Sequence, residues 1–280
     1  CNQWIEEKTG TKKALLTTSC THATELAALL ADVKAGDEVI MPSYTFVSTA
    51  DAFVLRGAIA VFVDIRPDTM NMDADLIEAA ITDKTKAIIL VDIAGIIADY
   101  DSVIEIAEKR KDSFVPSNDI QKAIGRIAVL ADCAHSLGAV KDGRNAGNIA
   151  DFSSFSFHAV KNLTTAEGGA SAWRHIDGVD NDELYHQYQL YSLHGQSKDA
   201  LAKTKLGAWE YDIVGAWYKC NMTDIAAAMG LRQLERYEDI ISRRLSIIEK
   251  YDRCCGELGI KHLNHVSDNH RGSGHLYITY

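Results

Sequence analysis

The sequence predicts an α/β protein in which a mostly parallel sheet is covered by helices on both faces. Over the first two-thirds of the 280 residues, short apolar runs alternate with segments of helical periodicity. This alternation is the pattern of a layered α/β structure. Most of the runs are apolar throughout, which is typical of parallel strands that are buried on both faces. A helix between successive strands fits this arrangement.

The expected elements follow in chain order, and each is bounded by an ordinary signal. Gly36 stops the first helix, and Pro42 ends the first strand. The expected helices are Ala23–Val33, Phe46–Leu55, Ala74–Ile81, Ser102–Lys111 and Asp182–Tyr191. The expected strands are Glu38–Met41, Ile59–Val63, the β-branched run Lys86–Asp92, Ile127–Ala131, and Phe152–Phe157 with its period of two.

The last part of the chain changes character. Helical periodicity over Met222–Arg253 predicts two consecutive helices, and His275–Tyr280 resembles the start of a strand. A long helical run often links a large domain to a smaller one. We therefore expect a large domain over 1–235, with a linker helix and the beginning of a small C-terminal domain over 236–280.

Composition narrows the class of protein. Lysine and arginine total 29 against 39 acidic residues, a net charge of −10, which argues against general nucleic-acid binding. No apolar run approaches the ~20 residues that cross a bilayer, and the N-terminus lacks a signal pattern. The cysteines form no CxxC pair, so neither a metal site nor a disulfide framework is expected. Scattered cysteines without a signal pattern fit a reducing compartment, and we therefore expect a cytoplasmic location. The cysteines are Cys1, Cys20, Cys133, Cys220, Cys254 and Cys255.

Two segments could bind an anion or a cation at the ends of strands. Thr17–Ala23 places small hydroxyl residues before a helix, where free N–H groups can bind phosphate; such residues are more often simple caps. In Leu130–Ala139, Asp132 falls at the carboxyl end of a buried strand, the edge where parallel sheets collect ligands. Its alternative is a capping aspartate.

Two later segments add a lysine and an asparagine. In Phe155–Ala170, Lys161 lies between an apolar strand and the pair Gly168-Gly169, whereas most lysines are solvated surface residues. In Tyr218–Met229, Asn221 precedes a Thr-Asp pair that can cap the following helix, and a plain helix start is the alternative. A phosphate loop, a strand-end carboxylate and a sheltered amine together indicate a catalytic site.

Nearly the whole chain resembles the DegT/DnrJ/StrS-type nucleotide-sugar aminotransferases. Phe155–Ala170 is similar to their Schiff-base segment, Leu130–Ala139 to their aspartate segment, and Asn221–Leu234 to the helix start that follows. Asp37–Lys86 is similar to the transaminases of dTDP-4-oxo-6-deoxyhexoses. The resemblance implies fold type I, with pyridoxal 5′-phosphate (PLP) as cofactor. Family members usually extend further at both ends, so the resemblance also implies a truncated chain.

The resemblance implies a role for each site residue. Lys161 would carry the cofactor as a Schiff base, and Asp132 would pair with the pyridine nitrogen. Phe46 would cover the ring face, although an ordinary core aromatic is the alternative, and His135 would flank the phenolic oxygen. The remaining residues would hold phosphate: Cys20, Thr21 and Ser156 in this subunit, and Asn221 reaching the cofactor of its neighbour in a homodimer.

The function implied is amino transfer, from glutamate, to a keto group of a dTDP- or UDP-linked 4-keto-6-deoxy sugar for polysaccharide biosynthesis. Dehydratases of the same fold carry histidine in place of the lysine, so Lys161 argues against them. A transaminase of a cyclitol or another non-sugar ketone stays open, as does a cofactor-binding relative without turnover. Asp92–Gly95 departs from the usual family segment, as does Cys20 in the phosphate loop.

Overall fold

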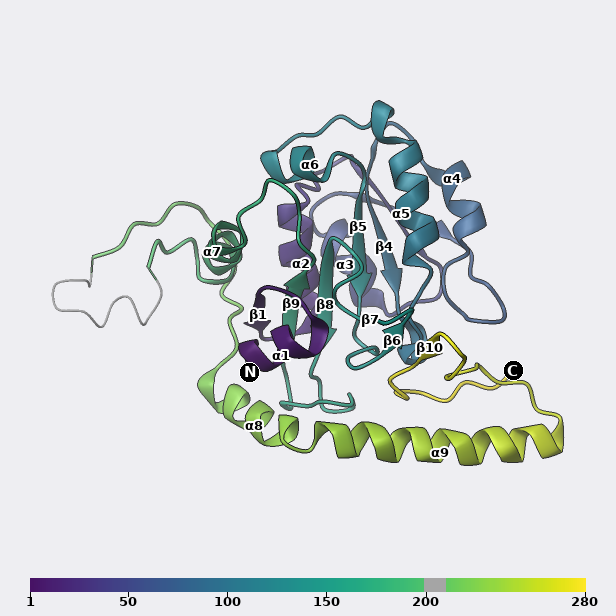
Figure 1. The fold of residues 1–280 in the computed structure, drawn as a ribbon. Coiled ribbons are helices and arrows are strands. Elements are labelled where there is room, and N and C mark those ends of the chain that lie inside the picture. The colour runs from purple at the N-terminus through teal and green to yellow at the C-terminus, as the bar shows by residue number, and fades with distance from the viewer. Residues whose placement is uncertain (199–209) are drawn as a thin grey trace.

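A seven-stranded sheet forms the centre of the protein in the computed structural model, which describes residues 1–198 and 210–280 (Figure 1). The strand order is β1-β9-β8-β5-β4-β2-β3, and β9 is the one strand of the seven that runs opposite to the other six. The mostly parallel sheet is therefore confirmed. The strands are β1 (Ala14–Thr17), β2 (Glu38–Pro42), β3 (Ile59–Val63), β4 (Thr85–Val91), β5 (Ala128–Asp132), β8 (Phe152–Ser156) and β9 (Gly169–Trp173).

Helices lie on both faces of this sheet, as the apolar strands predict. They are α1 (Asn2–Thr9), α2 (Cys20–Leu30), α3 (Val47–Val54), α4 (Ile77–Ala80), α5 (Tyr100–Lys109), α6 (Asp119–Ile124), α7 (Asn181–Ser192), α8 (Asp224–Leu234) and α9 (Tyr237–Leu258). The expected helix at Ala74–Ile81 is a 3₁₀ turn followed by the single α-helical turn α4.

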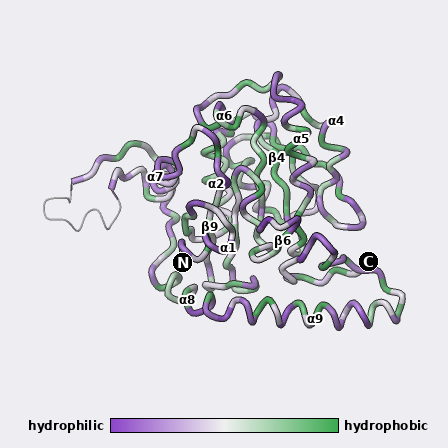
Figure 2. Tube along the Cα trace, in the orientation of Figure 1, coloured by the Kyte–Doolittle hydropathy of each residue, from purple (hydrophilic) through white to green (hydrophobic). Residues whose placement is uncertain are grey.

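Alternation along the central strand β4 separates two hydrophobic cores. Ile88 and Leu90 join the core that contains α5, whereas Ala87 and Ile89 join the core that contains α2, α3 and α7. Successive side chains of a strand point to opposite faces, so a strand that is apolar throughout needs a layer on each side. Figure 2 shows the hydrophobic central strands and the mixed colouring of the outer helices.

The C-terminal residues pack against the sheet domain. In α9, the buried residues Tyr237, Ile241, Ile248 and Cys255 recur at helical spacing, and Figure 1 shows this helix running along one end of the molecule. A small sheet joins β10 (His270–Arg271) to the hairpin of β6 (Val140–Lys141) and β7 (Arg144–Asn145). The division at residue 235 stays a prediction.

Several elements differ from the sequence-based expectation. His275–Tyr280 makes only an isolated bridge, Thr279 with His262, so the expected strand is wrong. A strand forms only when a partner with free backbone groups is adjacent, and local pattern does not reveal that. Seven of the helices and strands had no prediction: α1, α6, β1, β6, β7, β9 and β10. The residues of β9 (Gly-Ala-Ser-Ala-Trp) have little intrinsic preference for strands, so its position between β1 and β8 depends on tertiary packing.

A buried ion pair joins β5 to β8 and β9 away from the carboxyl ends. The Arg126 guanidinium donates to both carboxylate oxygens of Asp151 at 2.8 and 3.0 Å, and Arg174 donates to the same carboxylate. Asp151 is fully buried, so its charge needs these partners. Over residues 1–198 and 210–280, no helix is long and apolar enough to cross a membrane.

Candidate active site

The predicted site residues gather where the parallel strands end at their carboxyl edge. Asp132 is the last residue of β5, and Ser156 is the last residue of the adjacent strand β8. The loop after β8 carries Lys161, and α2 begins at Cys20. Ligands of parallel sheets bind at this edge, because the loops and helix N-termini there leave polar groups free.

Asp132 is buried, and three donors face its carboxylate. Thr49 donates to Oδ2 at 2.7 Å, the Ala134 N–H donates to Oδ1 at 3.1 Å, and the Cys20 thiol lies 3.8 Å from Oδ1. Burial raises the pKa of Asp132 above its ordinary value, while these hydrogen bonds and the charge of Lys161 oppose the rise. A cationic partner would therefore be strongly favoured beside this carboxylate.

Lys161 is partly buried near Asp132 and Cys20. Burial lowers the pKa of Lys161 below the ordinary lysine value, and the charges of Asp132 and Cys20 oppose this effect. A lysine that loses its proton more easily is a better nucleophile toward a carbonyl group. Lys161, Asp132 and Cys20 therefore lie close enough to influence one another electrostatically.

The phosphate loop begins at the N-terminus of α2. The Ser19 side chain caps the helix by accepting from the His22 N–H at 3.1 Å. Cys20 and Thr21 are the first two helical residues, so their N–H groups have no acceptor within the helix. Burial, and to a lesser extent the charge of Asp132, raises the pKa of the Cys20 thiol. Cys20 therefore stays a neutral thiol.

The glycine pair explains how β9 reaches this loop. A Cβ at Gly169 would lie 2.4 Å from the Ser19 carbonyl carbon and 2.6 Å from the Cys20 nitrogen. Only glycine allows the strand backbone to approach so closely. Ser156 is the register partner of Gly169, which places it beside the same loop, and its Oγ accepts a 3.4 Å hydrogen bond from the His158 N–H.

Phe46 and Asn221 each lie next to an element of the site, Phe46 before α3 and Asn221 beside the end of β1. Phe46 is the residue before α3 and is 73% exposed, so it is not an ordinary core aromatic. Asn221 forms a backbone bridge with Thr17, just before the phosphate loop, and its side chain accepts from Lys219. The reach of Asn221 to a second subunit stays a prediction.

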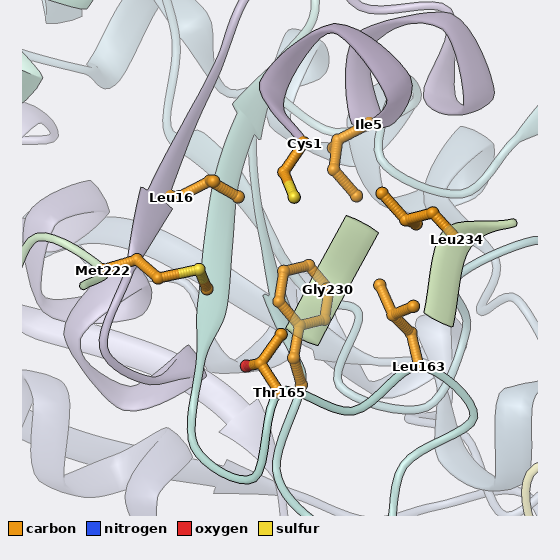
Figure 3. A pocket seen from close by; sticks show the side chains of 9 residues that line it. Cys1, Ile5, Leu16, Leu163, Thr165, Met222, Gly230 and Leu234 are labelled. Carbon is orange, nitrogen blue, oxygen red and sulfur yellow. The ribbon is translucent and has the colours of Figure 1, made fainter. Parts of the chain in front are cut away.

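An apolar layer supports the Lys161 loop from behind. Figure 3 shows the side chains that line a small pocket between this loop, α1, β1 and α8. Its volume is about 10 Å³. That volume is roughly the least that can hold one water molecule, and the lining offers few polar partners. It is lined by Cys1, Ile5, Leu16, Phe157, Leu163, Thr165, Met222, Gly230 and Leu234. The cavity is packing space and not a substrate pocket.

Sequence reasoning missed Thr49. Its position in the first turn of α3, three residues after Phe46, was the available signal, because the resemblance already implies that Phe46 lies over the cofactor ring. Thr49 Oγ1 also lies 2.8 Å from the Thr45 hydroxyl. Since Thr49 gives its only hydrogen to Asp132, Thr45 is the donor in that second contact.

The buried Asp92 was missed as well. Its carboxylate accepts from Ser136 at 2.6 Å, from the Ala98 N–H at 2.9 Å and from Tyr100 at 3.0 Å. Burial raises the pKa of Asp92, and these hydrogen bonds counter the rise. The segment Asp92–Gly95, which departs from the usual family sequence, thus holds the turn that carries His135 and Ser136. Among the described residues, no cluster of His, Cys, Asp and Glu could hold a metal ion.

The sheet and its covering helices form the fold class predicted from the sequence, that of the fold-type-I, PLP-dependent transferases. The chain belongs to the DegT/DnrJ/EryC1/StrS aminotransferase family, whose pattern matches residues 2–280. Both the predicted family and the predicted fold class are confirmed.

Two curated relatives resemble the chain over most of its length. MJ1066 of Methanocaldococcus jannaschii, described as an uncharacterized protein, is 38% identical over 244 residues, 87% of this chain and 58% of that protein. The spore coat polysaccharide biosynthesis protein SpsC of Bacillus subtilis is 36% identical over 270 residues, 96% of this chain and 64% of that protein. The chain thus spans 58–64% of the length of these relatives.

A solved relative gives the same picture in three dimensions. The putative sugar aminotransferase Spr1654 of Streptococcus pneumoniae, in its PMP-form, has a TM-score of 0.95 and 48% identity, and the match covers 99% of this chain and 70% of that one. The PLP-form of the same protein matches with a TM-score of 0.94. Together with family membership, this relative confirms the predicted PLP cofactor.

Proposed function

We propose that the chain is the cofactor-binding part of an aminotransferase that moves an amino group, from glutamate, to a keto group of a nucleotide-linked sugar. The sugar would be a dTDP- or UDP-linked 4-keto-6-deoxy sugar, and the enzyme a cytoplasmic homodimer in polysaccharide biosynthesis. The name of SpsC and the description of Spr1654 as a putative sugar aminotransferase support this substrate class.

One observation carries the proposal: an amine with a lowered pKa and a buried carboxylate share the strand-end edge with a helix N-terminus. When bound, PLP supplies an aldehyde that takes up amino groups and a ring that accepts electrons. Lys161 would hold it covalently through Nζ, and after release the same amine can move a proton. These two functions need one flexible amine beside the reacting carbon.

The other residues would bind and orient the cofactor. Asp132 would accept a charge-assisted hydrogen bond from the protonated ring nitrogen, which supplies the cation that its burial requires. The N–H groups of Cys20 and Thr21, with the Ser156 hydroxyl, would bind the phosphate at the α2 N-terminus. His135 would lie by the phenolic oxygen, and the exposed ring of Phe46 would cover one face.

Covalent attachment is the decisive test of Lys161. The protein is mixed with PLP and reduced with borohydride, and peptide mass spectrometry locates the added mass. We expect the added mass on Lys161 and none in Lys161→Ala. Lys250→Ala, which changes an exposed lysine of α9, is the matched control. Attachment to another lysine in the wild-type chain would refute the proposal.

Turnover is tested separately from attachment. Glutamate should convert the bound cofactor to its amino form, which the absorption spectrum reports, and a panel of nucleotide-linked keto sugars should reverse it. Asp132→Asn should keep the cofactor but slow the half-reaction on the order of 10- to 100-fold, because a charge-assisted hydrogen bond is lost. An unchanged rate would remove Asp132 from the mechanism.

A further inference from the structure

The segment Gly272–His275, near the end of the chain, packs directly on the edge of the candidate site. The Ser273 N–H donates to the Gly95 carbonyl at 3.1 Å, and the Ser273 hydroxyl donates to the His135 carbonyl. Gly95 has a φ of +92°, and a Cβ there would lie 2.1 Å from the Ser273 Oγ. The close fit shows that this segment has a fixed position against the His135 turn.

His275 links the two loops on either side of the site. Its ring lies against the His135 ring, with centroids 4.3 Å apart and planes inclined by 33°. The His275 Nδ1 lies 3.2 Å from Oδ1 of Asn162, the residue that follows Lys161. Asn162 donates in turn to the Ser273 carbonyl at 2.8 Å. Both His275 and Asn162 are buried.

These contacts assign opposite tautomers to the two rings. The Ala94 N–H donates to His135 Nδ1 at 3.2 Å, so that nitrogen carries no hydrogen and the neutral ring is protonated at Nε2. Asn162 uses its amide hydrogens toward Ser273, so its Oδ1 accepts and His275 Nδ1 is the donor. Burial lowers the pKa of His135 to about 4, and that of His275 to about 3, so both rings are neutral at pH 7.

We propose that His275 is a positioning residue of the cofactor site, which holds the His135 ring so that its Nε2–H is presented to the phenolic oxygen of the cofactor. Through Asn162, the same side chain steadies the loop of Lys161. The part about the cofactor rests on the proposed function, whereas the ring pair and the tautomers do not. Nothing near His275 in the sequence indicates this role, because His275 comes 140 positions after His135 and contacts it only in the folded chain.

The tautomers can be tested without a cofactor. Two-bond ¹H–¹⁵N spectra of the chain labelled with ¹⁵N-histidine, recorded near pH 7, distinguish protonated Nδ1 from protonated Nε2. We expect His135 to be protonated at Nε2 and His275 at Nδ1. The reverse tautomer in either ring, or rapid averaging of both, would overturn the proposal; this measurement needs no variant that might fail to fold.

Two variants then separate the ring contact from the hydrogen bond. His275→Phe keeps a ring against His135 but leaves Asn162 Oδ1 without its donor, and His275→Asn keeps a donor but loses most of the ring. We expect each to shift the His135 ring resonances and to weaken PLP binding about tenfold, the effect of one unsatisfied buried partner or a lost ring contact. PLP affinity is measured by absorption titration.

A matched control comes from the same segment of the chain. His262 stacks on Tyr277 with centroids 5.2 Å apart and contacts Asp252, away from His135. His262→Asn should leave both the His135 resonances and PLP affinity unchanged. If both His275 variants matched the wild type in these two readouts, the positioning role would be refuted. If the wild-type chain failed to bind PLP while the tautomers held, the proposed function would fail instead.

Discussion

Thr49 Oγ1 donates a 2.7 Å hydrogen bond to Oδ2 of Asp132, although 83 positions separate the two residues. The bond joins the first turn of α3 to the end of β5, and it is one of the interactions that oppose the burial-driven rise in the pKa of Asp132. The carboxylate that would face the cofactor nitrogen is therefore held in place by a hydroxyl from the first turn of α3.

Replacing Thr49 tests this relationship. Thr49→Val keeps the shape but removes the donor, so the pKa of Asp132 should rise further, and the free energy of unfolding should fall by about 1–3 kcal/mol. Thr49→Ser keeps the hydroxyl and is the control. Carbon-13 NMR titration of Asp132 and urea unfolding report the two effects. Equal pKa values in the valine and serine variants would contradict the assignment.

Gly169→Ala should damage the phosphate loop. The added methyl meets the backbone of Ser19 and Cys20 at 2.4–2.6 Å, and backbone cannot yield as a flexible side chain does. We expect a loss of about 1–3 kcal/mol in unfolding free energy and weaker phosphate and PLP binding.

Gly256→Ala is the control for that change, because nothing lies within 4 Å of its Cβ position in α9. Alanine there should stabilise the protein by up to about 1 kcal/mol through helix propensity. Chemical denaturation of both variants gives the comparison. A Gly169→Ala protein as stable as wild type, with normal PLP affinity, would show that β9 can withdraw from the loop.

The prediction that Asn221 serves the neighbouring subunit can be tested by complementation. Homodimers of Lys161→Ala and homodimers of Asn221→Ala would each lack an intact site, but a mixed dimer would contain one site with both wild-type residues. Mixing should therefore restore part of the transamination rate, up to roughly one site in two within mixed dimers. Subunit exchange is verified with differently tagged chains. Exchange without any recovery would place Asn221 in its own subunit's site.

The buried histidines predict a loss of stability in mild acid. Folding lowers the pKa of His135 and His270 to about 4 and of His275 to about 3, so the unfolded chain binds more protons below the ordinary histidine pKa. Their contribution is complete above about pH 6.5 and is lost as the pH falls toward 4. Protonation of each of these histidines in the unfolded chain should lower the free energy of unfolding by on the order of 1 kcal/mol between pH 7 and pH 5.

Burial raises the pKa of Asp92 and Asp132, which acts with the opposite sign. For such carboxyls the contribution is complete below the unfolded pKa and is lost as the pH rises through the folded one. The histidine part is isolated by comparing urea unfolding at pH 7 and pH 5 for wild type and His270→Asn. A variant whose stability falls as steeply as that of wild type would rule out His270 as a source of the loss.

Much of the fold could be predicted because its signals are local. Ile59–Val63 was placed with its observed bounds, and Lys86–Asp92 lies one residue from the observed β4. A short apolar run that is bounded by glycine, proline or a charged residue predicts a buried strand from local sequence alone. The strand β9 escaped prediction because glycine and alanine carry little β-propensity, and its position depends on the loop that it must approach.

The sequence by itself determined the family and the sheet of apolar strands, and it is the source of the proposed roles of Lys161 and Asp132, because all of these depend on contiguous segments. Only the tertiary structure decided which distant side chains support them: Thr49 on Asp132, and His275 on His135. Such contacts join segments through space, and their hydrogen bonds depend on distances and orientations that no local pattern contains.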